Sequence, residues 1–103
     1  MKKIEFYKTM FNGSGKAPRY EKSTGYDADY VSNGTIIKLI FEKCKHDWCI
    51  TEFSSGLQVR RNFDTRKEAL EFITPELLQK IIERLENNKY VSMLAEYRAA
   101  CAE

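Results

Sequence analysis

The chain has 103 residues, of which 43% are hydrophobic, and its formal net charge is +2. This length fits a single domain over residues 1–103, with enough apolar side chains to fill a core without disulfides or a structural metal. The small net charge does not by itself indicate nucleic-acid binding.

The cysteines and the N-terminal residues indicate the compartment. Three cysteines are an odd number in a chain that can fold without disulfides, which is typical of a reducing cytosol. The first eleven residues, MKKIEFYKTMF, lack the apolar stretch of a signal peptide. No apolar run approaches the length that spans a membrane. We therefore expect a cytoplasmic protein without membrane contact.

The first expected strand covers residues 2–9, where Ile4 and Phe6 alternate with polar neighbours. Residues 11–34 show no sustained period and predict a long loop, with a short strand at residues 19–22 as an option. A loop of this length in a small domain indicates a functional segment, a mobile one or a strand that the pattern hides.

Residues 35–63 predict three antiparallel strands joined by tight turns. In the strand at residues 35–43, Ile37, Leu39 and Phe41 share one face, and the other face is half covered. A second strand is expected at residues 48–53. After a turn at Ser54–Gly56, where glycine permits a positive φ, a third strand runs to Phe63.

Helical patterns follow the strands. Thr65 and Glu68 form the sequence pattern of a capping box, and Thr74 and Pro75 begin a second helix. After a break at residues 86–89, a last helix extends to about residue 101. The order predicts an α+β fold: an antiparallel sheet of three to four strands, followed by two to three helices on one sheet face.

A glycine-rich segment, Gly13–Lys16, looks like part of a phosphate-binding loop. The full pattern requires a glycine five residues before the second glycine and a serine or threonine after the lysine. Met10 and Ala17 occupy these two positions. The match fails, and we predict a simple turn.

The segment Cys44-Lys45-His46-Asp47-Trp48-Cys49 holds three candidate metal ligands, Cys44, His46 and Cys49, with Cys101 as a remote fourth. The spacing matches none of the common zinc patterns. Because Cys44 and Cys49 flank a hairpin turn, we expect them to face each other across two strands. We predict reduced packing cysteines with no metal and no cofactor; the alternative is a metal site or a redox pair.

The single histidine, His46, has Cys44, Cys49 and Asp47 nearby in sequence, as a nucleophile–base pair would require. A hairpin tip is a poor place to orient three groups and to exclude water. We therefore expect no enzyme.

Paired acids and tyrosines occupy the expected long loop. The residues are Tyr20, Tyr26, Asp27, Asp29 and Tyr30. If this segment is extended, both carboxylates point to the same side, where they could bind a cation or act as acid and base. Tyrosine with serine, glycine and asparagine is typical of adaptable binding surfaces. We favour contact with another protein.

Four residues of the last helix, Tyr90, Leu94, Tyr97 and Cys101, recur at helical spacing. The sequence does not distinguish packing of this stripe in the core from the seam of a homodimer.

A basic joint connects the last strand to the first helix. Arg60 and Arg61 point to opposite faces of the strand, while Arg66 and Lys67 occupy the first helical turn, where the helix dipole disfavours cations. With Lys38 on the sheet, Arg60, Arg66 and Lys67 form a candidate phosphate-binding set.

Three strands followed by this joint resemble the small N-terminal arm-binding modules of tyrosine integrases, whose sheet enters a DNA major groove. The matching residues are Trp48, Gly56, Phe63, Thr65, Lys67, Glu68 and Ala69. Those modules carry dense cations on the outer sheet face, whereas Glu42 and Glu52 accompany Lys38 and Arg60 here. We assign no family from this resemblance.

Two functional hypotheses result. The first is a small non-catalytic binding protein that acts through protein–protein contacts. By analogy of size and composition, it includes a phage or mobile-element inhibitor of a host nuclease, as anti-CRISPR and anti-restriction proteins are. The alternative is a nucleic-acid-binding module that uses the sheet face and the basic joint.

Overall fold

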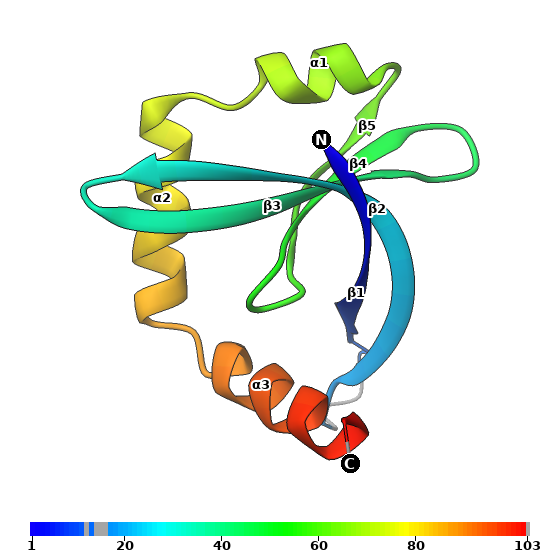
Figure 1. Ribbon diagram of the computed structural model, residues 1–103, viewed down its shortest axis with the longest axis vertical. Helices are drawn as coiled ribbons and strands as arrows, with labels where there is room; N and C mark the ends of the chain where they lie inside the picture. Colours follow the sequence, from blue (N-terminus) through cyan, green and yellow to red (C-terminus); the bar gives the residue numbers. More distant parts are fainter. Residues whose placement is uncertain (12, 14–16, 103) are drawn as a thin grey trace.

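The computed structural model describes residues 1–11, 13 and 17–102. Five antiparallel strands form one sheet in chain order, and three helices follow (Figure 1). The α+β class is confirmed, and the sheet has one strand more than the largest number expected. The elements are β1 (Lys2–Met10), β2 (Arg19–Ser32), β3 (Thr35–Lys43), β4 (Trp48–Glu52), β5 (Gln58–Phe63), α1 (Arg66–Glu71), α2 (Pro75–Glu86) and α3 (Tyr90–Cys101).

Strand β2 occupies most of the segment for which we expected a long loop. It pairs along its length with β1 on one side and with β3 on the other. Its sequence hides this role because both of its faces carry polar or aromatic side chains, so no apolar alternation is visible. The loop prediction is wrong for residues 23–32, and the optional strand at residues 19–22 is the first part of β2. The turn predicted at residues 13–16 falls largely outside the described residues.

The sheet has an outer face, which the helices cover, and an inner face. As predicted, Ile37, Leu39 and Phe41 share one face of β3, and this is the outer face. They pack with Ile50 of β4 and with a stripe of α1 and α2 side chains in the main core. The stripe consists of Ala69, Leu78, Ile81 and Ile82.

The sheet curls so strongly that β1 reaches the turn between β4 and β5 (Figure 1). The Thr9 backbone N–H donates to the carbonyl oxygen of Gly56 at 2.9 Å, and the Thr9 hydroxyl donates to the carbonyl of Ser55 at 2.5 Å. Gly56 has the positive φ that we expected, +68°. A side chain there would meet the Tyr7 carbonyl oxygen at 2.6 Å, so the closure requires glycine.

The curl encloses a second, smaller core on the inner face. Phe6, Ile40 and Cys49 are buried there, although they alternate with residues of the outer face. Strand β2 crosses this core at Gly25, where an added Cβ would lie 2.6 Å from Ile40 Cγ2. A glycine therefore lets β2 approach β3 closely enough to curl.

The helix starts follow the sequence signals. The Thr65 hydroxyl accepts from the Glu68 N–H at 3.1 Å, and the Thr74 hydroxyl accepts from the Leu77 N–H at 3.2 Å. The Glu68 carboxylate accepts from the Asp64 N–H at 3.3 Å, one residue earlier than a capping box predicts. In the described residues, no helix has the length and apolar character needed to cross a membrane.

Candidate functional site

The end of the β2–β3 hairpin projects from the sheet (Figure 1). The β1 ladder meets β2 no further than Asp27, and the β4 ladder meets β3 no further than Leu39. In the sheet ladders of the described residues, residues 30–37 therefore pair with one another alone. We call this segment the hairpin tip.

One side of the hairpin tip is anchored. Tyr30 and Ile37 belong to the main core with α2. The Asn33 side-chain amide donates to the side-chain oxygen Oε1 of Gln79 on α2 at 2.8 Å. The tip is therefore held against a helix and does not extend freely into solvent.

The other side of the hairpin tip exposes an apolar pair. Val31 and Ile36 are direct cross-strand neighbours, and 68% and 70% of their surfaces are exposed. Charged residues flank the pair: Asp29 is exposed, and Lys38 forms an ion pair with Asp27 at 3.7 Å. An apolar centre with a charged rim is the arrangement found at protein–protein interfaces.

The five residues predicted to bind a partner lie on β2 and separate by face. Tyr20, Tyr26 and Tyr30 point outward, where helices and neighbouring aromatic rings partly bury them. Burial raises the pKa of Tyr20 and of Tyr30 above the ordinary value. Asp27 and Asp29 share the opposite face, as the extended-segment argument expected, and Asp29 is the exposed one of the two.

The exposed pair has a sequence signal that the loop interpretation obscured. Asn33 and Gly34 both adopt positive φ, at 50° and 78°. Asn-Gly flanked by segments of alternating apolar residues is a strong short-range signal for a two-residue hairpin. Applied to this segment, it places Val31 and Ile36 opposite each other on one face.

The four cations of the nucleic-acid hypothesis do not form one surface. Lys38 lies on the inner face beside the hairpin tip. Arg66 is the first residue of α1, and the guanidinium of Arg60 lies 5.2 Å from the ring centroid of Phe72, directly after α1. Lys67 is exposed in the first turn of α1.

Cations and aromatic rings alternate on the outer face beside α1. The Arg66 guanidinium lies 5.2 Å from the Tyr26 ring and 6.0 Å from the Trp48 ring, and the Lys43 ammonium lies 5.8 Å from the same Trp48 ring. We call this group the basic-aromatic surface. The sequence did not connect Lys43, Tyr26 and Trp48 with Arg66, because their proximity depends on the pairing of β2, β3 and β4.

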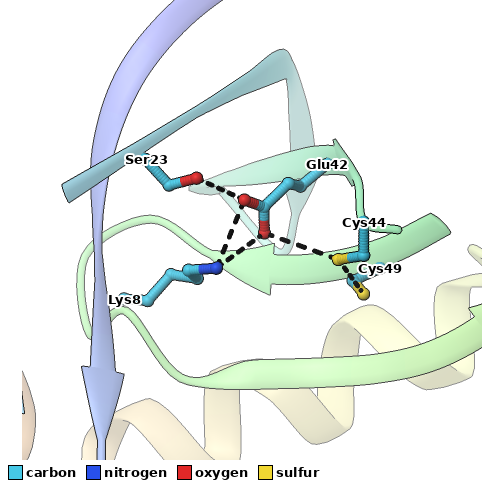
Figure 2. Close-up of polar contacts among 5 residues, drawn as sticks. All are labelled: Lys8, Ser23, Glu42, Cys44 and Cys49. Carbon is cyan, nitrogen blue, oxygen red and sulfur yellow. Dashed lines mark hydrogen bonds and ion pairs between the residues drawn. The ribbon is translucent and has the colours of Figure 1, made fainter. Parts of the chain in front are cut away.

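The inner face carries a polar cluster around Glu42 (Figure 2). Glu42 is 7% exposed, and its two carboxylate oxygens both lie 3.3 Å from the Lys8 ammonium. The Ser23 hydroxyl also donates to this carboxylate, and the Cys44 thiol lies 3.9 Å from it. Strands β1, β2 and β3 each supply a member because the curl brings their inner faces together.

The two hairpin cysteines face each other as predicted. Their sulfur atoms lie 2.8 Å apart, and both thiols are free. Burial raises the pKa of the Cys49 thiol to about 12, and the hydrogen bond with Cys44 and the nearby carboxylates Asp47 and Glu42 add to the shift. The Cys49 thiol therefore stays protonated at neutral pH.

The expected metal ligands come together in part. Ligand atoms of Cys44, Asp47 and Cys49 lie within 4.8 Å of one another. His46 and Cys101 are exposed, and neither belongs to this group. The third potential ligand beside the two thiols is therefore Asp47, and His46 is not part of the group.

The stripe on α3 packs within the chain. Leu94 is fully buried, Tyr97 lies edge-on to Tyr7 at 5.3 Å, and Tyr90 lies edge-on to Phe11 at 5.1 Å between ring centroids. These contacts match the core-packing alternative. The homodimer seam stays a prediction, with Cys101 as the exposed member of the stripe.

The chain was also compared with known proteins. No protein-family model, no curated protein and no solved structure matches it.

Proposed function

We propose that this protein is a non-catalytic binding protein that acts through protein–protein contacts, and that the exposed side of the hairpin tip is its contact surface. The observation that supports this proposal most is the cross-strand pair Val31 and Ile36, with 68% and 70% of their surfaces exposed. Single exposed apolar residues are ordinary, but two that are adjacent on a projecting, anchored hairpin are a candidate interface.

Anchoring makes this surface suitable for binding. The Asn33–Gln79 hydrogen bond and the packing of Tyr30 and Ile37 restrict the hairpin tip before any partner arrives. A preorganised surface loses less conformational entropy on binding. The proposal places this activity in the cytoplasm, because three free thiols suit a reducing compartment.

The test is affinity capture from lysates of candidate host bacteria, with and without nuclease treatment. The immobilised bait is the natural chain or a Val31→Lys/Ile36→Lys variant, whose exposed substitutions change the free energy of unfolding by about 0.5 kcal/mol each at most. Thr24→Lys is the matched control, because Thr24 is an exposed position on the same strand.

We expect a protein that survives nuclease treatment, binds the natural chain and Thr24→Lys equally, and is lost with the double variant. Retention of the same protein by the double variant would show that the hairpin tip is not the contact surface.

A narrower form of the proposal is inhibition of a host nuclease by a phage or mobile-element product. Its support is the small size of the chain and analogy with other inhibitors, as in the sequence argument. If the captured partner is a nuclease, its cleavage rate in the presence of the natural chain and of the double variant tests this form directly.

The second candidate function is nucleic-acid binding at the basic-aromatic surface. Arg66 and Lys43 lie over aromatic rings, and stacked rings among cations are how many proteins hold single-stranded nucleic acid. Replacement of Arg60, Arg66 and Lys67 by alanine should abolish binding. Lys80→Ala/Lys89→Ala, which removes two exposed cations elsewhere, should not.

The readout is the salt dependence of affinity for duplex DNA and for single strands. Each phosphate contact contributes a slope of about −0.9 for duplex DNA and about −0.7 for single strands. Undetectable affinity at low salt for both substrates would remove this candidate.

A further inference from the structure

The two inner-face thiols lie closer together than packing alone requires. Cys44 comes directly after the end of β3, Cys49 belongs to β4, and their sulfur atoms are 2.8 Å apart. The Cys44 N–H donates to the Asp47 carbonyl oxygen at 2.8 Å, which keeps the hairpin ends together. A disulfide, with a bond of about 2.05 Å, therefore needs a short movement of the sulfur atoms.

The two thiols differ in access to solvent. Both line a partly open cavity of about 200 Å³ between β1 and β5. Cys44 is half-buried, whereas Cys49 is 6% exposed. A small reagent that enters the cavity therefore meets Cys44 first, with Cys49 directly behind it.

We propose that Cys44 and Cys49 form a dithiol site that reacts with small anionic disulfides, of which glutathione disulfide is the model, and closes to an intramolecular disulfide. Two cations, Lys8 and Arg61, and one carboxylate, Glu42, line the same cavity. Lys8 is paired with Glu42, whereas the Arg61 side chain is 63% exposed and suits a carboxylate of such a reagent. This site lies apart from the hairpin tip, and the proposal does not depend on partner binding there.

The reaction is two thiol–disulfide exchanges. The Cys44 thiolate attacks one sulfur of the reagent, the reagent S–S bond breaks, and the first thiolate leaves and takes up the proton that Cys44 lost. The Cys49 thiolate then attacks the Cys44 sulfur and displaces the second thiolate, which takes up the Cys49 proton. The protein is oxidised by two electrons, and one reagent disulfide is reduced to two thiols.

The surroundings of Cys49 affect the second of these exchanges. Burial raises the pKa of Cys49, and the carboxylates of Asp47 and Glu42 add to this effect. Cys49 therefore rests as a thiol at neutral pH, and the second exchange, in which its thiolate attacks, is slow. The site suits stoichiometric oxidation better than rapid turnover.

The geometry favours a disulfide over a zinc site at the same residues. Two thiolates on one tetrahedral zinc, each at about 2.3 Å, lie about 3.7 Å apart, and the sulfur atoms here lie much closer. The Asp47 carboxylate, the third potential ligand, already accepts from the Asn62 N–H at 2.8 Å and lies 3.7 Å from the Arg61 guanidinium. The carboxylate would have to give up these interactions to bind a metal.

The experiment uses the full chain with Cys101→Ser, which removes the exposed third thiol. The reduced protein is equilibrated with excess glutathione disulfide, the remaining thiols are alkylated, and the intact mass is measured. We expect one internal disulfide, no bound glutathione and no alkylation, with full reversal by dithiothreitol.

Two further variants in the Cys101→Ser background separate the roles of the thiols. With Cys49→Ser added, Cys44 should retain one glutathione, because no resolving thiol remains. With Cys44→Ser added instead, glutathionylation should be slower than in the Cys49→Ser variant by a factor of about ten or more, because Cys49 is buried. In urea this difference should vanish, which shows that the fold causes it.

Two results would overturn the proposal. One is the absence of an internal disulfide in the Cys101→Ser protein. This protein would then carry two bound glutathiones, or it would keep two free thiols under conditions that glutathionylate the Cys49→Ser variant. The other is a reduced protein that retains one zinc ion per chain after dialysis against zinc-free buffer and is thereby protected from oxidation. We expect zinc to be lost on dialysis.

Discussion

The two halves of β3 have similar sequences but different surroundings. At residues 39–42, Leu39, Ile40 and Phe41 are fully buried and Glu42 is 7% exposed, so both faces of the strand are covered. In the preceding residues, Ile37 is 1% exposed and Ile36 is 70% exposed, so one face is covered and the other is open. The difference arises because β1 curls over one half and ends before the other.

One half of β3 contributes to the stability of the sheet, and the other half is accessible to a binding partner. The covered half holds two cores and a buried ion pair, and the open half presents an apolar pair on an anchored hairpin. An isoleucine therefore has a different role at position 36 than at position 40, although its chemistry is the same.

The largest expected effect comes from truncation in the covered half. Phe41→Ala should lower the free energy of unfolding by about 3–5 kcal/mol, because a fully buried aromatic ring leaves a cavity. Ile36→Ala, its counterpart in the open half, should change it by about 0.5 kcal/mol or less. Urea unfolding measures both. Equal losses would mean that the inner face of the hairpin tip is covered in solution.

The buried ion pair should have the next largest effect. Lys8→Met leaves the Glu42 carboxylate with a smaller set of partners and should cost about 2–3 kcal/mol, below the full range for buried pairs because Lys8 is partly exposed. Lys22→Met, which removes an exposed ion pair with Glu5, should have no measurable effect. A Lys8→Met protein as stable as the natural chain would show that water reaches Glu42.

Oxidation of the dithiol site should stabilise the protein by a smaller amount. A disulfide between Cys44 and Cys49 closes a short loop, for which the loss of chain entropy in the unfolded state gives about 2 kcal/mol. The measurement is urea unfolding of the Cys101→Ser protein, oxidised and reduced. A lower stability after oxidation would show that the disulfide distorts the hairpin.

The effect of alkaline pH is the smallest of the four near pH 9 and grows as the pH rises. The folded state holds the Cys49 proton up to about pH 12, while a thiol with the ordinary value of 9.0 releases it earlier. Unfolding therefore releases a proton between these values, and stability should fall as the pH rises through this window. Cys49→Ala should remove this part of the slope in reducing buffer. If the dependence of stability on pH is unchanged in Cys49→Ala, other groups cause it.

The sequence predicted the parts of the fold that local patterns determine. The alternation of Ile37, Leu39 and Phe41 identified the outer face, and Thr65 and Thr74 identified two helix starts. It did not predict β2, because one face of this strand is mainly polar and the other mixes tyrosines with polar residues, so the strand has no clear apolar period. The loop interpretation then hid the Asn33–Gly34 hairpin signal, and with it the exposed pair.

The candidate sites divide in the same way. The sequence predicted that Cys44 and Cys49 face each other, because both flank the same turn and this is a local property. The placement of Lys8 and Ser23 against Glu42 depends on the curl that brings β1, β2 and β3 together. The separation of Lys38 from Arg66 by the sheet was likewise beyond the sequence pattern.

By itself, the sequence determined the class of fold, the helix starts and the two thiols at one hairpin, because each of these depends on neighbours within a few residues. The tertiary structure alone decided that the sheet curls and that β1 covers half of β3. These outcomes depend on close approaches at Gly25 and Gly56 between strands distant in sequence. The exposed pair and the buried polar cluster both follow from that curl, since it determines which alternating side chains meet solvent and which meet each other.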